Sequence, residues 1–158
     1  MYYPFKEVIE DNGRVFVNNQ LHYENGRYTI DFADFEQKII DHNVKVFLLC
    51  NPHNPVGRVW SAEELQRLGE ICLAHHVIIL DDEIHCDFIY PGFHFTSFFT
   101  LDKKFHKNLV VFTSPSKTFN VARFPACQYH HSRSKPCGRP TKRPTLLPAT
   151  ARAASWVR

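Results

Sequence analysis

The fold of this chain is decided by the stretch Val44-Lys-Val-Phe-Leu-Leu-Cys50, which continues directly into Asn51-Pro-His-Asn-Pro-Val-Gly57. The first part is an apolar run of strand length, a pattern typical of a strand that is buried on both faces of a sheet. The second part carries two prolines and a glycine, which predict a loop. We therefore expect a buried strand that ends in a polar loop.

A helix and two further buried strands are predicted after this stretch. Ser61-Ala-Glu-Glu64 has the pattern of a capping box, and an apolar stripe at helical spacing follows it. Val77–Leu80 and Leu109–Thr113 are apolar runs of strand length, and the aromatic-rich segment 93–99 between them predicts a partly covered loop. Strand, helix and strand joined by short links favour an α/β fold, with a mainly parallel sheet flanked by helices.

The residues before the stretch predict two short strands and a helix. Arg14–Asn18 and Tyr28–Ile30 have strand character, and the turn-prone pair Asn25-Gly26 lies between them. Asp31 is a candidate N-cap for a helix that extends to about His42, because apolar residues recur there at helical spacing. The chain has 158 residues, of which 44% are apolar. This content allows one ordinary domain with a core and excludes wholesale disorder.

The net charge of +3 is an average over two unlike parts. Residues 1–122 hold 11 basic and 16 acidic residues, a net charge of −5. Residues 123–158 hold 8 basic residues, no acidic residue and five of the ten prolines, a net charge of +8. We expect a folded body over 1–122 and a basic, proline-rich, irregular or disordered tail over 123–158. A tail that binds polyanions is the alternative, but it has no aromatic interleaving, which argues against a nucleic-acid partner.

Several classes of protein are disfavoured by what the sequence lacks. The longest apolar runs are too short to cross a bilayer, and no secretory signal opens the chain. The five cysteines are odd in number and widely spaced, without a Cys-x-x-Cys pair. His75-His76 and His130-His131 have no partners at metal-binding spacing. We expect a cytoplasmic protein with reduced thiols, no metal site and no membrane contact.

Polar residues follow each of the three buried runs. The three clusters are Asn51–Gly57, Asp81–His85 and Ser114–Asn120. Since ligands of parallel α/β sheets bind beyond the carboxyl ends of the strands, we expect one shared site there. A carboxylate can hold a cationic ring nitrogen, a lysine can form an imine, and hydroxyl groups can bind phosphate. These are the needs of pyridoxal 5′-phosphate (PLP).

The three clusters also carry a family resemblance. Asn51-Pro-His-Asn-Pro-Val-Gly57, Asp82-Glu-Ile-His85 and Ser114-Pro-Ser-Lys-Thr-Phe-Asn120 resemble, in order and spacing, the motifs of fold-type I PLP enzymes, the aminotransferase class I/II superfamily. The histidines in the first two motifs most resemble the cystathionine β-lyase-like (C–S lyase) branch. The opening Tyr2-Tyr3-Pro4-Phe5 is similar to a segment of that family as well. The resemblance implies that residues 1–122 are the central part of a PLP-binding large domain.

The resemblance implies a role for each of three central residues. Lys117 would bind the cofactor covalently and act as the general base at the substrate Cα, although a single lysine is by default a solvated surface residue. Asp82 would pair with the pyridine nitrogen of PLP. Its alternative role is to cap a turn, for which Asp81 is the better candidate. Asn54 would hydrogen-bond the phenolic oxygen of PLP, or else serve only as a turn residue before proline.

Four more residues take weaker assignments from the resemblance. Ser114 and Ser116 would contact the phosphate, or else only cap the loop. His85 lies where many relatives have a tyrosine near the phenolic oxygen. Tyr2 would stack on the cofactor ring, although a terminal tyrosine is often a surface residue.

The implied reaction is α,β-elimination of an amino acid with a sulfur leaving group, such as cystathionine or a cysteine S-conjugate, to thiol, pyruvate and ammonia. One alternative is a PLP-dependent aminotransferase of class I/II, which shares these motifs. Another is a non-catalytic remnant whose basic tail binds polyanions. The histidine-containing motifs favour the lyase.

The resemblance also has limits. Complete relatives are longer, and the chain lacks their phosphate loop and their carboxylate-binding arginine. We therefore expect a fragment of low activity, and the missing segments count against the homodimer that relatives form. The resemblance stops at Ala122. A one-base frame slip explains this, because codons for Gln128-Tyr-His-His-Ser132, read one base later, can encode the family's Asn-Ile-Ile-Ile strand. Codons in the gene that are incompatible with this reading would refute it.

Overall fold

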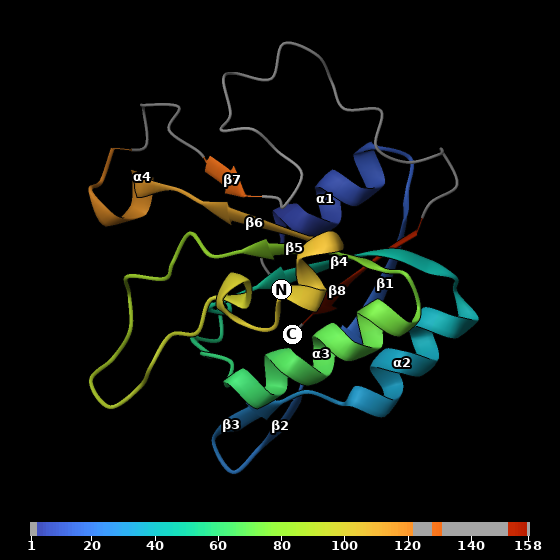
Figure 1. Cartoon of the computed structure of the whole chain (residues 1–158), viewed down its shortest axis with the longest axis horizontal. Coiled ribbons are helices and arrows are strands. Elements are labelled where there is room, and N and C mark those ends of the chain that lie inside the picture. Colours follow the sequence, from blue (N-terminus) through green and yellow to red (C-terminus); the bar gives the residue numbers. More distant parts are fainter. Residues whose placement is uncertain (1–2, 122–127, 131–151, 158) are drawn as a thin grey trace.

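The computed structural model describes residues 3–121, 128–130 and 152–157, which form an α/β structure around one six-stranded sheet (Figure 1). Its strands, in spatial order, are β1 (Val15–Gln20), β8 (Arg152–Val157), β4 (Val44–Cys50), β5 (Ile78–Asp82), β6 (Leu109–Thr113) and β7 (Gln128–His130). The first five strands are mutually parallel, and β7 pairs antiparallel with β6 at one edge. The predicted α/β class with a mainly parallel sheet is confirmed.

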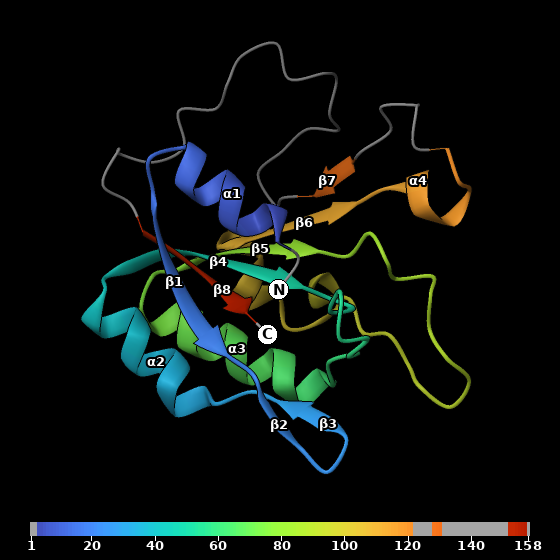
Figure 2. The same cartoon turned by 180° about the vertical axis from the view of Figure 1, so that it is seen from behind.

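Helices cover both faces of this sheet (Figures 1 and 2). One face carries α1 (Pro4–Asp11), and the other carries α2 (Phe32–Asp41) and α3 (Ala62–Ala74). The remaining elements are short, namely the hairpin of β2 (His22–Glu24) and β3 (Arg27–Thr29), the 3-10 turns η1 (Phe98–Thr100) and η2 (Lys103–Lys107), and α4 (Pro115–Thr118). No helix in the described ranges is both long and apolar enough to cross a membrane.

The two longer helices begin where their capping residues predict. The Asp31 side chain accepts a hydrogen bond from the backbone N–H of Asp34 at 2.9 Å, which satisfies one of the free donors of α2. Ser61 accepts from the N–H of Glu64 at 3.2 Å, and the Glu64 carboxylate accepts from the N–H of Ser61 at 2.8 Å. This reciprocal pair is the predicted capping box.

The main core lies between the sheet and the pair α2 and α3. Alternate residues of β4 divide between the faces, since Phe47 and Leu49 face α2 and α3 while Val46 packs with Ile9 of α1. The largest fully buried side chains of the structure are Trp60, Phe35, Phe47, Phe98 and Phe105. Burial on both faces explains why β4 is an almost unbroken apolar run.

Several elements differ from the sequence-based expectation, among them β2, where no strand was predicted, and α1, β7 and β8. The segment Pro4–Asp11 is helical, because Pro4 stands in the first turn and Ile9 supplies a buried contact to the sheet. After residue 122 no regular element was predicted, yet β7 and β8 both join the sheet. The rest of 123–158 lies outside the described residues, so the expected tail is untested there.

Candidate active site

The three polar clusters lie together at the carboxyl edge of the sheet. β4, β5 and β6 are neighbours and end at the same level, because Cys50 pairs with Asp82 and Asp82 pairs with Phe112. The arrowheads of these strands point the same way in Figure 1, toward the side of α4. The predicted convergence of the three clusters on one edge is therefore present in the structure.

The loop after β4 is held by backbone hydrogen bonds. Asn51 donates its N–H to the carbonyl of Asp82 at 2.9 Å, which ties the loop to β5. His53 donates to the carbonyl of Arg58 at 2.7 Å and accepts from Gly57 at 2.8 Å. Gly57 has a φ of +69°, a conformation that favours glycine. Asn54, half-buried, donates its N–H to Cys50 Sγ at 3.3 Å, and its side-chain amide makes no hydrogen bond among the described residues.

Arg58 and Trp60 fix the same loop from behind. The Arg58 guanidinium donates to the carbonyls of Tyr28 and Val59 at 2.8 and 2.7 Å and pairs with Glu64 at 2.5 Å. It also stacks on the Trp60 ring, with 4.8 Å from Cζ to the ring centroid. Trp60 donates its indole N–H to the carbonyl of Cys50 at 3.0 Å. The loop that carries Asn54 is thus anchored to the hairpin, to α3 and to β4.

Asp82 stands at the end of β5, between Cys50 of β4 and Phe112 of β6, and its carbonyl accepts from the Asn51 N–H. Burial raises the pKa of its carboxyl group, while the bond from the Ile84 N–H and the nearby charges of His85 and Lys117 oppose this shift. Its Oδ1 accepts from the Ile84 N–H at 3.2 Å. Asp82 therefore makes the turn contact that the sequence analysis assigned to Asp81. That assignment is wrong, because Asp81 is fully buried on the opposite face.

Lys117, Ser114 and Ser116 all belong to the short helix after β6. Ser114 is the N-cap of α4, since its Oγ accepts from the Ser116 N–H at 3.2 Å, and it donates to Ser116 Oγ at 2.9 Å. The Lys117 amine is exposed and forms no hydrogen bond or ion pair with the described residues. The neighbouring Thr118 donates to Asp87 at 2.5 Å, which links α4 to the loop after β5.

The two remaining predicted cofactor-binding residues are His85 and Tyr2. His85 lies in the turn after Asp82, with its ring edge toward Phe88 at 6.1 Å between centroids. Tyr2, the predicted ring-stacking residue, lies outside the described residues, so its role stays a prediction. Among the described residues, no group of three or more His, Cys, Asp or Glu side chains could hold a metal ion.

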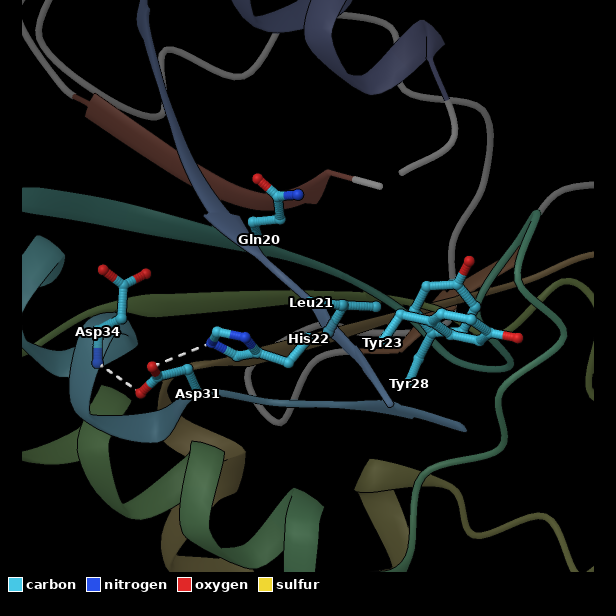
Figure 3. A pocket seen from close by; sticks show the side chains of 7 residues that line it. All are labelled: Gln20, Leu21, His22, Tyr23, Tyr28, Asp31 and Asp34. Carbon is cyan, nitrogen blue, oxygen red and sulfur yellow. Dashed lines mark hydrogen bonds and ion pairs between the residues drawn. The ribbon is translucent and has the colours of Figure 1, made fainter. Parts of the chain in front are cut away.

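A cavity of about 610 Å³ lies elsewhere, beside the end of β1 and the β2–β3 hairpin (Figure 3). None of the predicted site residues lines it. Its carboxylates and its histidine are already engaged, because Asp31 caps α2 and pairs with His22 at 3.2 Å, and Asp34 pairs with Lys38 at 2.6 Å. Tyr23 and Tyr28 pack on each other with 4.6 Å between ring centroids. We assign the cavity no part in the candidate active site.

Sequence reasoning missed the buried groups behind the site. Asp81, Glu83 and Asn51 are buried, and His53 is buried against Trp60. Burial lowers the pKa of His53 to about 3, which keeps its ring neutral. The alternation of side chains along a strand could have revealed these buried groups, because in β5 it places Asp81 and Glu83 on the face opposite to Asp82.

Comparisons with known proteins find relatives of this chain. The chain is 48% identical over 122 residues to cystathionine beta-lyase PatB of Bacillus subtilis strain 168, a match that covers 77% of this chain and 32% of that protein. It superposes with a TM-score of 0.81 and 40% identity on PLP-containing cystalysin of Treponema denticola, over 84% of this chain and 34% of that one. A PLP-bound C-S lyase of Staphylococcus hominis gives a TM-score of 0.75 and 37% identity, over 81% and 32% of the two chains.

The matched structures that contain PLP share the α/β fold of this chain. The family model of aminotransferase class I and II matches residues 1–154, and the chain belongs to this family. It spans about a third of the length of the curated relative PatB.

The residues at the sheet edge fit the cofactor of this family. An exposed amine, a half-buried carboxyl group, a half-buried amide without a side-chain partner and two hydroxyls at the start of α4 lie at one edge of the sheet. PLP presents an aldehyde, a ring nitrogen, a phenolic oxygen and a phosphate, and each has a matching group here. Lys117 matches the aldehyde and Asp82 matches the ring nitrogen. Asn54 matches the phenolic oxygen, and Ser114 and Ser116 match the phosphate.

Proposed function

We propose that this chain carries the cofactor-binding centre of a PLP-dependent C–S β-lyase. The reaction is α,β-elimination of cystathionine or a cysteine S-conjugate to a thiol, pyruvate and ammonia. The observation that carries the proposal is the placement of Asp82 and Lys117 at the carboxyl ends of the adjoining strands β5 and β6, where the Lys117 charge opposes the rise in the Asp82 pKa that burial causes. The similarity to cystathionine beta-lyase PatB and to the C-S lyase supports the lyase branch.

The roles of the side chains follow from their surroundings. PLP, when bound, draws electrons from the substrate Cα and so acidifies the Cα proton. Lys117 accepts that proton in its neutral amine form, and the amine has no hydrogen-bond or ion-pair partner among the described residues that would compete. Asp82, held by the Ile84 N–H, complements the cationic ring nitrogen. Asn54 orients the phenolic oxygen, while Ser114 and Ser116 hold the phosphate. His85 adds a further polar contact beside Asp82.

Transamination is the competing reaction within the same family. Both reactions begin with removal of the Cα proton, so the residues at the sheet edge serve either one. They differ in the next step, because elimination expels a thiolate from Cβ whereas transamination returns the proton to a cofactor carbon. The histidines of the first two motifs, His53 and His85, favour elimination by their resemblance to the lyase branch.

Addition of PLP to the purified full chain tests whether the cofactor centre is assembled. We expect a new absorbance band from the imine between Lys117 and PLP, which borohydride reduction converts to a stable adduct on the peptide that contains residue 117. Lys117→Ala abolishes the band and the adduct. Lys103→Ala is the matched control, because Lys103 is also exposed and lies in η2. An adduct that survives in Lys117→Ala contradicts the assignment.

Product analysis separates the two reactions. A lyase releases thiol and pyruvate from cystathionine without any added keto acid. An aminotransferase consumes an amino acid only when a keto-acid acceptor is present, and it releases no thiol. Strict dependence of turnover on the acceptor would overturn the lyase proposal and leave the cofactor site intact.

A further inference from the structure

Arg58 connects the candidate active-site loop to two other elements, although no step of the proposed mechanism uses it. Each nitrogen atom of its guanidinium has a partner of its own. Nε donates to the carbonyl of Tyr28 at 2.8 Å, Nη1 donates to the carbonyl of Val59 at 2.7 Å, and Nη2 pairs with Glu64 Oε1 at 2.5 Å. Tyr28 lies in β3 and Glu64 lies in α3. One side chain therefore bridges the hairpin and the helix.

The surroundings of Arg58 hold its guanidinium in one orientation. The side chains of Arg58 and Glu64 are only 13% and 18% exposed. Glu64 is itself fixed, because its other oxygen accepts from the Ser61 N–H in the capping box. The guanidinium also stacks on Trp60, which is fully buried and donates to the Cys50 carbonyl. A planar group that is bonded at every nitrogen and stacked on a fixed ring has little freedom to turn.

The position of Arg58 is transmitted to Asn54 through the backbone. His53 and Arg58 form an antiparallel bridge, in which the His53 N–H donates to the Arg58 carbonyl at 2.7 Å. Inside this bridge, the Gly57 N–H donates to the His53 carbonyl at 2.8 Å. Residues 53–58 thus form a closed loop, and Asn54 is the first residue inside it. Because Arg58 is one end of the closed loop, a displacement of Arg58 displaces Asn54 as well.

Lysine cannot replace arginine in this arrangement. A lysine carries one ammonium group at the end of a flexible stem, and it has no donor at the place of Nε. Arg58→Lys therefore keeps a positive charge for Glu64 and loses the bond to the Tyr28 carbonyl. Arg67 offers a matched comparison, because its guanidinium also stacks on an aromatic ring, at 4.3 Å from the centroid of Phe32. It is exposed and lies within α3, away from the closed loop.

We propose that Arg58 is a positioning residue for Asn54, and that it couples the β2–β3 hairpin and α3 to the cofactor side of the closed loop. The bridge fixes the Asn54 amide before PLP binds. Arg58 therefore acts on the cofactor only through Asn54. The role of Asn54 toward PLP rests on the proposed function, whereas the coupling of Arg58 to the loop does not depend on PLP.

Hydrogen exchange of the full chain without PLP tests the coupling. The N–H groups of His53 and Gly57 are both bonded within the loop. We expect Arg58→Lys to raise their exchange rates about fivefold, the equivalent of one lost hydrogen bond, while β5 stays as protected as in the wild type. Arg67→Lys leaves the loop rates unchanged. Unchanged exchange at both His53 and Gly57 in Arg58→Lys overturns the proposal.

A second variant covers the case in which Arg58→Lys also loses protection in β5. Combining Arg58→Gln with Glu64→Gln leaves no buried charge unpaired, and glutamine can serve in a capping box as glutamate does. We expect this variant to show the same loss of protection at His53 and Gly57 with β5 intact. Loss of protection in β5 here as well means that Arg58 stabilises the whole chain, and it overturns the local role.

Titration with PLP tests whether Arg58 acts through Asn54. We expect the Kd for PLP to rise about fivefold in Arg58→Lys and about tenfold in Asn54→Ala. In the Asn54→Ala background, Arg58→Lys has no further effect, because the group that it positions is gone. A further fivefold rise in that background overturns the proposal, since a general structural role weakens binding with or without the Asn54 amide.

The two measurements separate this inference from the proposed function. If the wild-type chain binds no PLP, the proposed function fails, and hydrogen exchange at His53 and Gly57 still decides whether Arg58 positions the loop. If PLP binds and exchange in the loop is unchanged in Arg58→Lys, the cofactor site stands and the inference fails.

Discussion

Asp81 and Asp82 are neighbours in sequence, yet β5 directs their carboxyl groups to opposite faces of the sheet. Asp82 is half-buried beside the charges of Lys117 and His85. Asp81 is fully buried, and burial together with the nearby Glu83 charge raises the pKa of its carboxyl group. The same type of side chain therefore meets two environments, one partly open beside positive charges and one fully buried.

The role of Asp82 is open to a direct test at the level of cofactor binding. A hydrogen bond to a charged group contributes about 1.5–3 kcal/mol. We expect Asp82→Asn to raise the Kd for PLP at least about tenfold, measured by titration of absorbance or of protein fluorescence. Asp41→Asn, an exposed change of the same chemistry, leaves the Kd as it is. An unchanged Kd in Asp82→Asn would remove Asp82 from the cofactor site.

The positions of some site residues could be predicted from the sequence, and those of others could not. Asn54, Asp82 and Lys117 follow apolar runs, and the parallel arrangement of those runs brings their ends to one edge. The contact of Glu83 with Ser97 spans 14 residues and depends on the path of the loop between them. That path has no periodic signal, so this contact was not foreseen.

Gly69 shows how one element constrains another. It lies within α3, and a Cβ atom built there would stand 2.8 Å from Cε1 of Phe105 in η2. Phe105 is fully buried and packs edge-on against Phe98 at 5.8 Å between centroids, so its ring has little room to move. The glycine permits close approach of η2 to α3, despite the lower helix propensity of this residue.

We expect Gly69→Ala to destabilise the chain by about 1–3 kcal/mol in urea unfolding, because overpacking exceeds the gain in helix propensity of about 1 kcal/mol. Phe105→Leu shortens the side chain at the clash. The double variant should therefore lose less unfolding free energy than the sum of the two single variants. If Gly69→Ala stabilises the chain, the close packing described for α3 and η2 is wrong.

Elements with local signals were predicted well. The capping box at Ser61 and the N-cap at Asp31 were confirmed, and the strands Val44–Cys50 and Leu109–Thr113 have the predicted bounds. The helix Pro4–Asp11 was missed, because it buries only Ile9 and presents mostly polar residues. A helix with a single buried residue leaves almost no periodic pattern to recognise.

The sheet as a whole depends on a strand from the far end of the sequence. β8 pairs with β1 on one side and with β4 on the other, so it joins β1 to the rest of the sheet. Its pairing with β1 links residues 15–20 with residues 152–157. The composition of the basic segment gave no indication of this strand, because the pairing is long-range and leaves no local signal.

A proline in β8 tests this arrangement, because proline removes a backbone donor from the ladder. We expect Ala154→Pro to increase hydrogen exchange in β1 and β4 while β5 and β6 stay protected, as measured by mass spectrometry of peptic peptides. Ala149→Pro, outside β8, is the control. Unchanged protection in both β1 and β4 would show that residues 152–157 do not hold the sheet together.

The late position of β8 also bears on how the chain is synthesised. β1 and β4 leave the ribosome long before residues 152–157 exist, so each waits with a row of unpaired backbone donors and acceptors. Such open edges are templates for pairing with other chains. During translation the position of β8 between β1 and β4 therefore stays unfilled until residues 152–157 are synthesised. Chaperones that bind exposed strand edges would act on the nascent chain during this period.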